Sequence, residues 1–165
     1  LYNVPGRTAC DLHIDTVERL AQLENVVGIK DATGDLQRGR ELIKRCGDKL
    51  AIYSGEDGIA RELILAGADG TISVTANVAP ALMAKMCAAA LAGDQDEAEK
   101  LDTALAMLHR NLFLEANPVP VKWALTQMGL ISPGIRLPLV ELSAEFHVQV
   151  LQALEAAGIP IPAAA

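Results

Sequence analysis

Val26-Val27-Gly28-Ile29-Lys30-Asp31-Ala32-Thr33-Gly34 is the stretch that decides the fold of this chain. Four residues without a polar side chain lead directly into a lysine, and a turn-forming Asp-Ala-Thr-Gly sequence follows. A β-branched run bounded by turn residues is typical of a fully buried strand in a parallel sheet. The pattern therefore predicts a strand over residues 26–30, with Lys30 at or near its C-terminal end.

Lys30 is the first candidate for a catalytic residue. Because an ammonium group is costly to desolvate, an amine at the end of a buried strand is expected to be partly neutral near physiological pH. A neutral amine on a rigid strand can attack a ketone and form a Schiff base. The same residue also fits a structural role, in which it closes the strand and either reaches water or pairs with Asp31. The stretch alone leaves both interpretations open.

The same pattern repeats along the first part of the chain. Short apolar runs, each followed by turn residues and a helix-like segment, recur about every 20–25 residues. Strands that alternate with helices at this spacing indicate βαβ crossovers and a parallel sheet. The expected strands are the end of a strand at 1–5 and the segments 26–30, 50–54 and 70–74; the expected helices lie around 12–23, 36–46 and 59–65.

Such units build either a doubly wound sheet or a (β/α)8 barrel. No GxGxxG or Walker-type loop follows an expected strand, which removes the main phosphate-loop argument for the doubly wound sheet. Polar residues follow every expected strand, and in a barrel they would converge at the C-terminal face, where catalysis takes place. They are Tyr2 and Arg7, Lys30 and Thr33, Ser54 and Glu56, and Ser73 and Asn77. We therefore predict an α/β fold that forms the C-terminal half of a (β/α)8 TIM barrel.

Only helical patterns follow residue 78, over 79–92, 94–114, 121–128 and 139–157. We predict that residues 1–93 form the second half of the barrel, which carries Lys30, and that residues 94–165 form a C-terminal helical domain. At the ends of the helices we expect Asp15 and Asp35 as N-caps and Gly47 as a terminator, with Pro5–Thr8 in a loop.

Composition and charge exclude several classes of partner. A net charge of −7 over 165 residues argues against nucleic acid. No apolar run approaches the roughly 20 residues of a bilayer span and no signal peptide opens the chain, so we expect no membrane partner and a cytoplasmic location. The three cysteines, Cys10, Cys46 and Cys87, lack metal-binding spacing, and we expect them to be reduced and mostly buried.

Five segments carry a resemblance to a known family. They are Tyr2-Asn3-Val4-Pro5-Gly6-Arg7-Thr8, Gly28-Ile29-Lys30-Asp31-Ala32-Thr33-Gly34, Ser54-Gly55-Glu56-Asp57, Gly70-Thr71-Ile72-Ser73-Val74 and Asn117-Pro118-Val119-Pro120-Val121-Lys122. Together they resemble the C-terminal part of the dihydrodipicolinate synthases, class I aldolase-type lyases of lysine (diaminopimelate) biosynthesis. Since the chain opens on Leu1 and the first half of that family's barrel is not present in it, we expect a fragment that is inactive alone.

The resemblance implies a role for each candidate site residue. Lys30 matches the lysine that forms the Schiff base with pyruvate, and Tyr2 matches the proton relay beside it. Arg7 matches the residue that holds the carboxylate of L-aspartate 4-semialdehyde, to which a planar guanidinium is well suited. Gly55 and Ile72 match positions that line the pyruvate pocket through their backbones. We expect neither a cofactor nor a metal ion, because the amine itself supplies the electron sink.

The implied reaction gives 4-hydroxy-tetrahydrodipicolinate, and the family resemblance also implies a homotetramer. Two alternatives remain at this point. One is another pyruvate-dependent aldolase of the same superfamily, such as N-acetylneuraminate lyase or a keto-deoxy-sugar-acid aldolase, from which Arg7 is the distinguishing residue. The other is a non-catalytic half-barrel remnant that only packs against a partner.

Overall fold

The computed structural model describes residues 1–162, and these divide into two compact units. Unit 1 comprises residues 1–73 and 86–99, and unit 2 comprises residues 74–85 together with those from 100 onward. The end of the expected helical domain, residues 163–165, lies outside the described residues. The boundary expected after residue 93 falls within unit 1, and the two-domain assignment stays a prediction.

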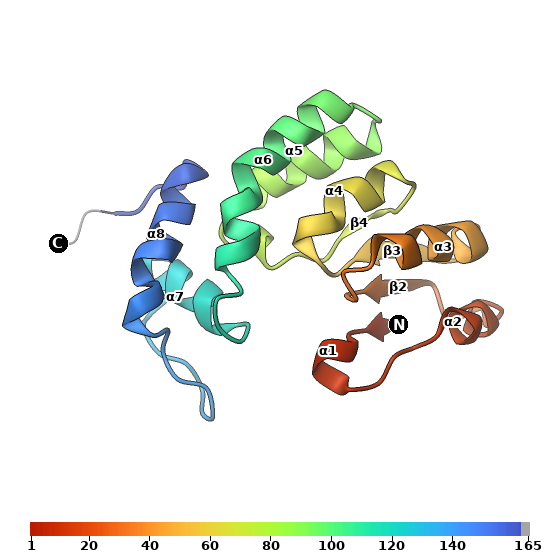
Figure 1. Ribbon diagram of the computed structural model, residues 1–165, viewed down its shortest axis with the longest axis horizontal. Helices are drawn as coiled ribbons and strands as arrows, with labels where there is room; N and C mark the ends of the chain where they lie inside the picture. The colour runs from red at the N-terminus through yellow and green to blue at the C-terminus, as the bar shows by residue number, and fades with distance from the viewer. Residues whose placement is uncertain (163–165) are drawn as a thin grey trace. The chain divides into compact units, whose positions relative to one another are not determined.

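Unit 1 contains a four-stranded parallel sheet whose strands lie in chain order (Figure 1). The strands are β1 (Tyr2–Asn3), β2 (Gly28–Asp31), β3 (Ala51–Ser54) and β4 (Gly70–Thr71). The prediction of a parallel sheet from strand–helix alternation is confirmed. The strands are shorter than expected at 26–30 and 70–74, because only the residues that pair with a neighbouring strand keep the extended ladder.

The register of the sheet places two rows of residues across it. One row is Tyr2, Lys30, Tyr53 and Gly70; the other is Asn3, Asp31, Ser54 and Thr71. Because successive residues of a strand point to opposite faces, the two rows belong to opposite faces of the sheet. Lys30 therefore shares a face with Tyr2 and Tyr53.

The helices of unit 1 cover the other face. They are α2 (Ile14–Leu20), α3 (Leu36–Cys46) and α4 (Asp57–Leu65). Ile29 and Ile52 of the sheet pack against them in a buried cluster, with Val17, Leu42 and Leu63 as the helical partners. The prediction that β2 is fully buried was therefore wrong. Ile29 and Asp31 are buried, whereas Gly28 and Lys30 are half-buried, because α2–α4 cover only one face of the sheet.

The sequence predictions for the helix ends were partly right. Asp35 caps α3 as expected, accepting from the backbone N–H groups of Gln37 and Arg38 at 2.9 and 3.1 Å. The cap of α2 is His13 rather than Asp15, which lies in the first turn. Pro5–Thr8 is a one-turn helix, α1, rather than a loop, because a proline at the first helical position supplies a suitable φ angle.

The second part of the chain is helical, as expected. Its elements are α5 (Pro80–Leu91) and α6 (Gln95–Asn111), which belong partly to each unit, and, in unit 2, η1 (Thr75–Asn77), α7 (Val119–Gln127), η2 (Ala144–Phe146) and α8 (His147–Ala156). No helix among residues 1–162 is both long enough and apolar enough to cross a bilayer.

Two helix boundaries in unit 2 differ from the sequence prediction because of prolines and a polar tether. Helix α7 begins at Val119, since Pro118 is its N-cap and Pro120 lies in the first turn, where proline is tolerated. The last helix begins eight residues later than the expected residue 139. Ser143 is held in an extended conformation, and its hydroxyl donates to Glu115.

The three cysteines differ in exposure, so the expectation that they are mostly buried was wrong for one of them. Cys10 is exposed, Cys46 is buried and Cys87 is half-buried. Burial raises the pKa of the Cys46 thiol and of the Cys87 thiol above the ordinary value. A raised pKa leaves less thiolate, which is the reactive form, at a given pH.

We predict that iodoacetamide at about pH 8 modifies Cys10 well before Cys46 and Cys87, because reaction needs an accessible thiolate. Peptide mass mapping over time measures the order. Raising the pH should speed the modification of Cys87. In the denatured protein the three cysteines should react at similar rates. Equal rates at all three cysteines in the folded protein would contradict the burial described here.

Candidate functional site

Lys30 and Tyr2 lie side by side on the face of the sheet that α2–α4 leave uncovered. They are paired in register between β1 and β2, and the Lys30 Nζ lies 4.5 Å from the centroid of the Tyr2 ring. Tyr2 is 53% exposed and Lys30 is half-buried. An ammonium over an aromatic face is stabilised electrostatically. The two residues chosen from sequence as catalytic are thus brought together, with the amine over the ring face.

Gly55 leaves the space that the lysine stem occupies. A Cβ atom at this position would lie 2.8 Å from Lys30 Cε and 2.6 Å from Ala32 Cβ, both closer than real Cβ contacts. The backbone N–H of Gly55 donates to Asp31 O at 2.7 Å, which continues the pairing of β2 with β3 beyond the strand. Gly55 therefore lies against the Lys30 side chain, and the absence of its own side chain makes that approach possible.

Ile72 and Arg7 lie beyond strand ends, as expected from the sequence. Ile72 follows β4, is half-exposed, and donates its N–H to Ser54 O at 2.8 Å. Arg7 lies on α1, directly after β1, with an exposed side chain. The backbone roles of Gly55 and Ile72 and the carboxylate contact of Arg7 stay predictions.

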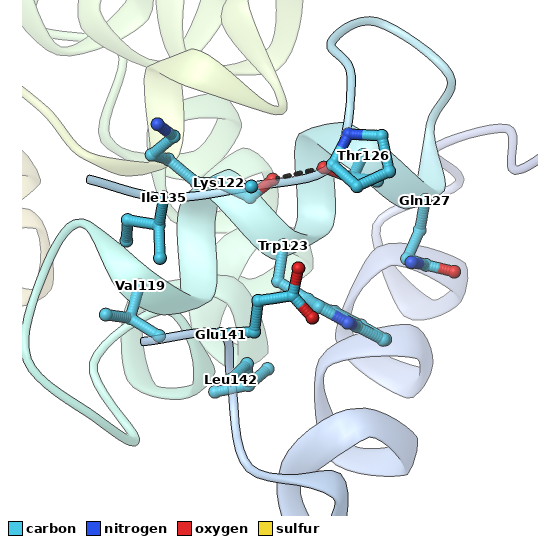
Figure 2. Close-up of a pocket in the computed structure, with 10 residues that line it drawn as sticks. Val119, Lys122, Trp123, Thr126, Gln127, Ile135, Glu141 and Leu142 are labelled. Carbon is cyan, nitrogen blue, oxygen red and sulfur yellow. Dashed lines mark hydrogen bonds between the residues drawn. The ribbon is translucent and has the colours of Figure 1, made fainter. Parts of the chain in front are cut away.

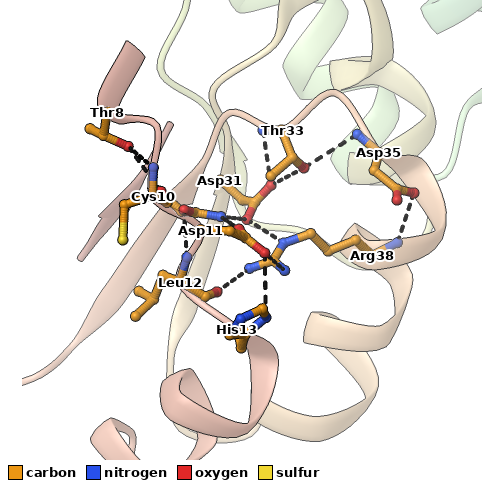
Figure 3. A network of polar contacts seen from close by, with 10 residues as sticks. Thr8, Cys10, Asp11, Leu12, His13, Asp31, Thr33, Asp35 and Arg38 are labelled. Carbon is orange, nitrogen blue, oxygen red and sulfur yellow. Dashed lines mark hydrogen bonds and ion pairs between the residues drawn. The ribbon is translucent and has the colours of Figure 1, made fainter. Parts of the chain in front are cut away.

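A polar cluster lies on the opposite face of the sheet from Lys30 and Tyr2. Figure 3 shows its contacts around Asp31 and Arg38. Its centre is the Asp31 carboxylate, which accepts from Arg38 Nε at 2.9 Å and from Asn3 Nδ2 at 3.2 Å. Thr33 donates to the same carboxylate through its N–H at 3.2 Å and its hydroxyl at 2.5 Å. Both oxygens of Asp31 are therefore occupied by donors.

The cluster extends to the segment that follows α1. Asn3 donates to Asp11 Oδ1 at 2.9 Å and accepts from the Leu12 N–H at 3.0 Å. Arg38 reaches the same segment, donating to Leu12 O at 2.5 Å and lying 3.5 Å from Asp11 Oδ2. Sequence reasoning did not find this cluster. The alternation along the two strands could have indicated it, since Asn3 and Asp31 are polar residues on the helix-covered face.

These contacts decide one alternative left open for Lys30 and give Thr33 a structural role. Asp31 points away from Lys30 and pairs with Arg38, so the alternative in which Lys30 pairs with Asp31 is wrong. Thr33 also accepts from the Asp35 N–H at 3.3 Å, which gives it a turn-forming role.

The three histidines have packing or surface positions. The His13 side chain is exposed, and His147 stacks on Trp123 with ring centroids 4.3 Å apart. His109 is buried, with Nδ1 2.9 Å from Thr75 Oγ1 and Nε2 3.4 Å from Asp102 Oδ1. Among residues 1–162, no group of three or more His, Cys, Asp or Glu side chains is placed to hold a metal ion.

A separate cavity of about 150 Å³ lies in unit 2, between α7 and the segment that leads to α8 (Figure 2). Trp123, Val119 and Leu142 supply apolar lining, and Lys122 and Glu141 supply charged groups. None of the site residues predicted from sequence lines this cavity. Lys122, however, lines this cavity, which makes it the natural competitor of Lys30 in a labelling experiment.

A primary amine near the C-terminal edge of a parallel sheet, beside a phenol, is an arrangement suited to Schiff-base chemistry on a carbonyl substrate. The family comparison agrees with this class. The model of the dihydrodipicolinate synthetase family matches residues 1–157, and the chain belongs to that family.

Curated relatives share more than half of their aligned residues with this chain. A 4-hydroxy-tetrahydrodipicolinate synthase of Thioalkalivibrio sulfidiphilus is 63% identical over 163 residues, covering 99% of this chain and 55% of that protein. The Pseudomonas aeruginosa synthase is 55% identical over 159 residues, covering 96% of this chain and 54% of that protein. The chain therefore spans about half the length of the curated relatives that it matches.

Solved structures give the same result for the fold. Chloride-inhibited dihydrodipicolinate synthase from Acinetobacter baumannii, complexed with pyruvate, matches with a TM-score of 0.95 and 56% identity over 97% of this chain and 55% of that one. The Aquifex aeolicus enzyme matches with a TM-score of 0.93 and 36% identity over 98% and 56%. The predicted fold class, part of a (β/α)8 barrel followed by C-terminal helices, is confirmed.

We predict that Gly55→Ala destabilises the protein by about 1–3 kcal/mol, because the new methyl group overpacks the space beside Lys30 and Ala32. Thermal unfolding measures the change. Gly58→Ala is the matched control: the nearest atom to its new Cβ, Glu56 Oε1, is 3.8 Å away. Equal melting temperatures for the two variants would show that Gly55 is not needed for the close approach of Lys30.

Proposed function

We propose that the full-length gene product carrying this chain condenses pyruvate with L-aspartate 4-semialdehyde to give 4-hydroxy-tetrahydrodipicolinate, through a Schiff base on Lys30. The observation that carries the proposal is the Lys30 amine held over the Tyr2 ring and against Gly55, near the carboxyl ends of parallel strands. Family membership and the names of the relatives support the same reaction.

The chemistry begins with the Lys30 amine. Neutral Nζ attacks the keto carbon of pyruvate, and loss of water from the resulting carbinolamine gives an imine. The protonated imine withdraws electrons, so a methyl proton of pyruvate can be removed to give an enamine. The enamine carbon then attacks the aldehyde of the semialdehyde, and attack of the semialdehyde's own amine on the imine carbon releases Lys30.

Tyr2 and Arg7 have separate tasks in this scheme. Each proton transfer around the imine nitrogen needs a group close by, and Tyr2, next to the amine, is the phenol placed for it. Arg7, on α1 directly after β1, would hold the semialdehyde carboxylate in bidentate fashion. The N–H groups of Gly55 and Ile72 bond to neighbouring strands, so their carbonyl oxygens would be the backbone groups that line the pyruvate pocket.

The rival aldolases are less well supported. Curated relatives at 55–63% identity carry the synthase name, and Arg7 suits a carboxylate better than a polyhydroxy chain. We also place the enzyme in the cytoplasm and propose a homo-oligomer, with a tetramer as the family-based expectation. One solved neighbour, 37% identical over 96% of this chain, is described as a monomeric dihydrodipicolinate synthase variant, so the oligomeric state needs direct measurement.

We predict that incubation of the full-length gene product with pyruvate and borohydride adds one reduced pyruvyl group, at Lys30. Peptide mass mapping locates it. Lys30→Arg, which keeps the charge but not the nucleophile, should abolish the adduct, and Lys122→Arg should not. An adduct at Lys122, or none in the unsubstituted protein, would contradict the proposed function.

We predict that Arg7→Ala and Tyr2→Phe fail in different ways. Arg7→Ala should lower kcat/KM for the semialdehyde by an amount equivalent to about 2–4 kcal/mol of lost transition-state binding, because one partner of a charged pair is lost. Formation of the borohydride-reduced pyruvate adduct should stay intact. Tyr2→Phe should slow turnover by about 10²–10⁴-fold, because a proton relay is lost. Steady-state kinetics in both substrates measures each effect, with Arg19→Ala as the surface control. Equal losses in both substrates for Arg7→Ala would contradict its carboxylate role.

A further inference from the structure

We propose that Asn3 and Asp31 are positioning residues that hold Tyr2 and Lys30 in productive register from the opposite face of the sheet. This inference rests on the proposed function, since it concerns the same amine and phenol. It assigns a catalytic consequence to the polar cluster behind them, which contains no residue expected to touch a substrate.

The first argument comes from the order of residues along the two strands. Asn3 directly follows Tyr2 on β1, and Asp31 directly follows Lys30 on β2. The two pairs are matched in register, Tyr2 with Lys30 and Asn3 with Asp31. The bond from Asn3 Nδ2 to Asp31 Oδ2, 3.2 Å long, therefore ties the strands together one residue away from the reactive pair.

The second argument is that the backbone ladder at this point is short. Strand β1 has two residues, and the bonds beside its ladder with β2 include Lys30 N–H to Leu1 O at 3.0 Å and Ala32 N–H to Asn3 O at 2.8 Å. Asn3 is 2% exposed and Asp31 is 5% exposed, so the side-chain bond between them is shielded from water. A hydrogen bond to a carboxylate in such surroundings is stronger than one at the surface.

The third argument is that the cluster is anchored to a rigid element. Arg38 lies on α3 and donates to Asp31 Oδ2 and to Leu12 O. Its helix is capped by Asp35, three residues earlier, which fixes the start of that helix. The Arg38–Asp31 contact therefore fixes β2 relative to α3, and the Asn3–Asp31 hydrogen bond fixes β1 relative to β2.

The same cluster also closes the segment that carries Arg7. That segment leaves β1 at Val4, forms α1, and returns to the cluster where Asn3 contacts Asp11 and Leu12. Both ends of the segment are therefore fixed at Asn3. Because a displacement of about 1 Å in a reacting group can cost about 100-fold in rate, these contacts have a catalytic consequence.

The test compares Asp31→Asn with Asp31→Glu in the full-length gene product. The amide of asparagine replaces one acceptor oxygen by a donor, which then faces the donors of Asn3 and Arg38 or those of Thr33. Glutamate keeps a carboxylate. The control is Arg45→Gln, which removes the ion pairs of Arg45 on α3 with Asp15 and Glu18 of α2, away from the site.

We expect Asp31→Asn to lower kcat by about 10- to 100-fold, measured well below its melting temperature, with little change in the KM for pyruvate. Exchange of the Ala32 amide, which bonds to Asn3 O, should become faster. Asp31→Glu should recover much of the lost kcat, and Arg45→Gln should lower the melting temperature but leave kcat unchanged.

The following results would overturn the inference. An unchanged kcat in folded Asp31→Asn would show that the cluster only stabilises the fold, and an equal loss of kcat in Arg45→Gln would show a general sensitivity to α3. If Asp31→Asn speeds Ala32 exchange but the unsubstituted protein forms no adduct with pyruvate, the proposed function fails and the cluster is only a structural clamp. A normal adduct in the unsubstituted protein with unchanged variants would refute the inference alone.

Discussion

The alternation of side chains along β2 is the constraint on which the rest of the structure depends. Lys30 points to one face of the sheet, and Asp31 points to the other. Had the two lain on one side, the carboxylate would pair with the charged ammonium form of Lys30, which is not the nucleophilic form that Schiff-base chemistry needs. Instead Asp31 is occupied by Arg38, Asn3 and Thr33, and the amine is left beside the Tyr2 ring.

Sequence predicted the parts of the fold that follow from local patterning. Apolar runs ending in turn residues predicted β3 to within one residue and β2 to within two, and Asp35 was correctly identified as the cap of α3. Errors arose where a neighbouring element decides the outcome. Residues 139–143 fit a helical pattern but form no helix, and Ser143 is extended and bonded to Glu115, 28 residues away in the chain.

For the site, sequence supplied the reactive residues but not their support. Lys30 could be chosen because an amine at the end of a buried strand suits Schiff-base chemistry, and Tyr2 was chosen because it matches the proton relay of the family that the sequence resembles. Gly55 could be named as a pocket residue, but its close approach to Lys30 Cε depends on the pairing of β2 with β3. Strand alternation could have indicated that Asn3 and Asp31 are polar residues on the helix-covered face, but their contacts with each other and with Arg38 join residues up to 35 positions apart and depend on the fold.

The central claim is that Lys30 forms the covalent bond to the substrate while Asp31 stays bonded behind it. A crystal structure of the full-length gene product soaked with pyruvate tests the statements about Lys30 and Asp31 together. The account predicts continuous electron density from Lys30 Nζ to the former keto carbon, next to Tyr2, with Arg38 and Asn3 still on the Asp31 carboxylate. An unmodified Lys30, with pyruvate bound elsewhere such as the cavity beside Trp123, would contradict it.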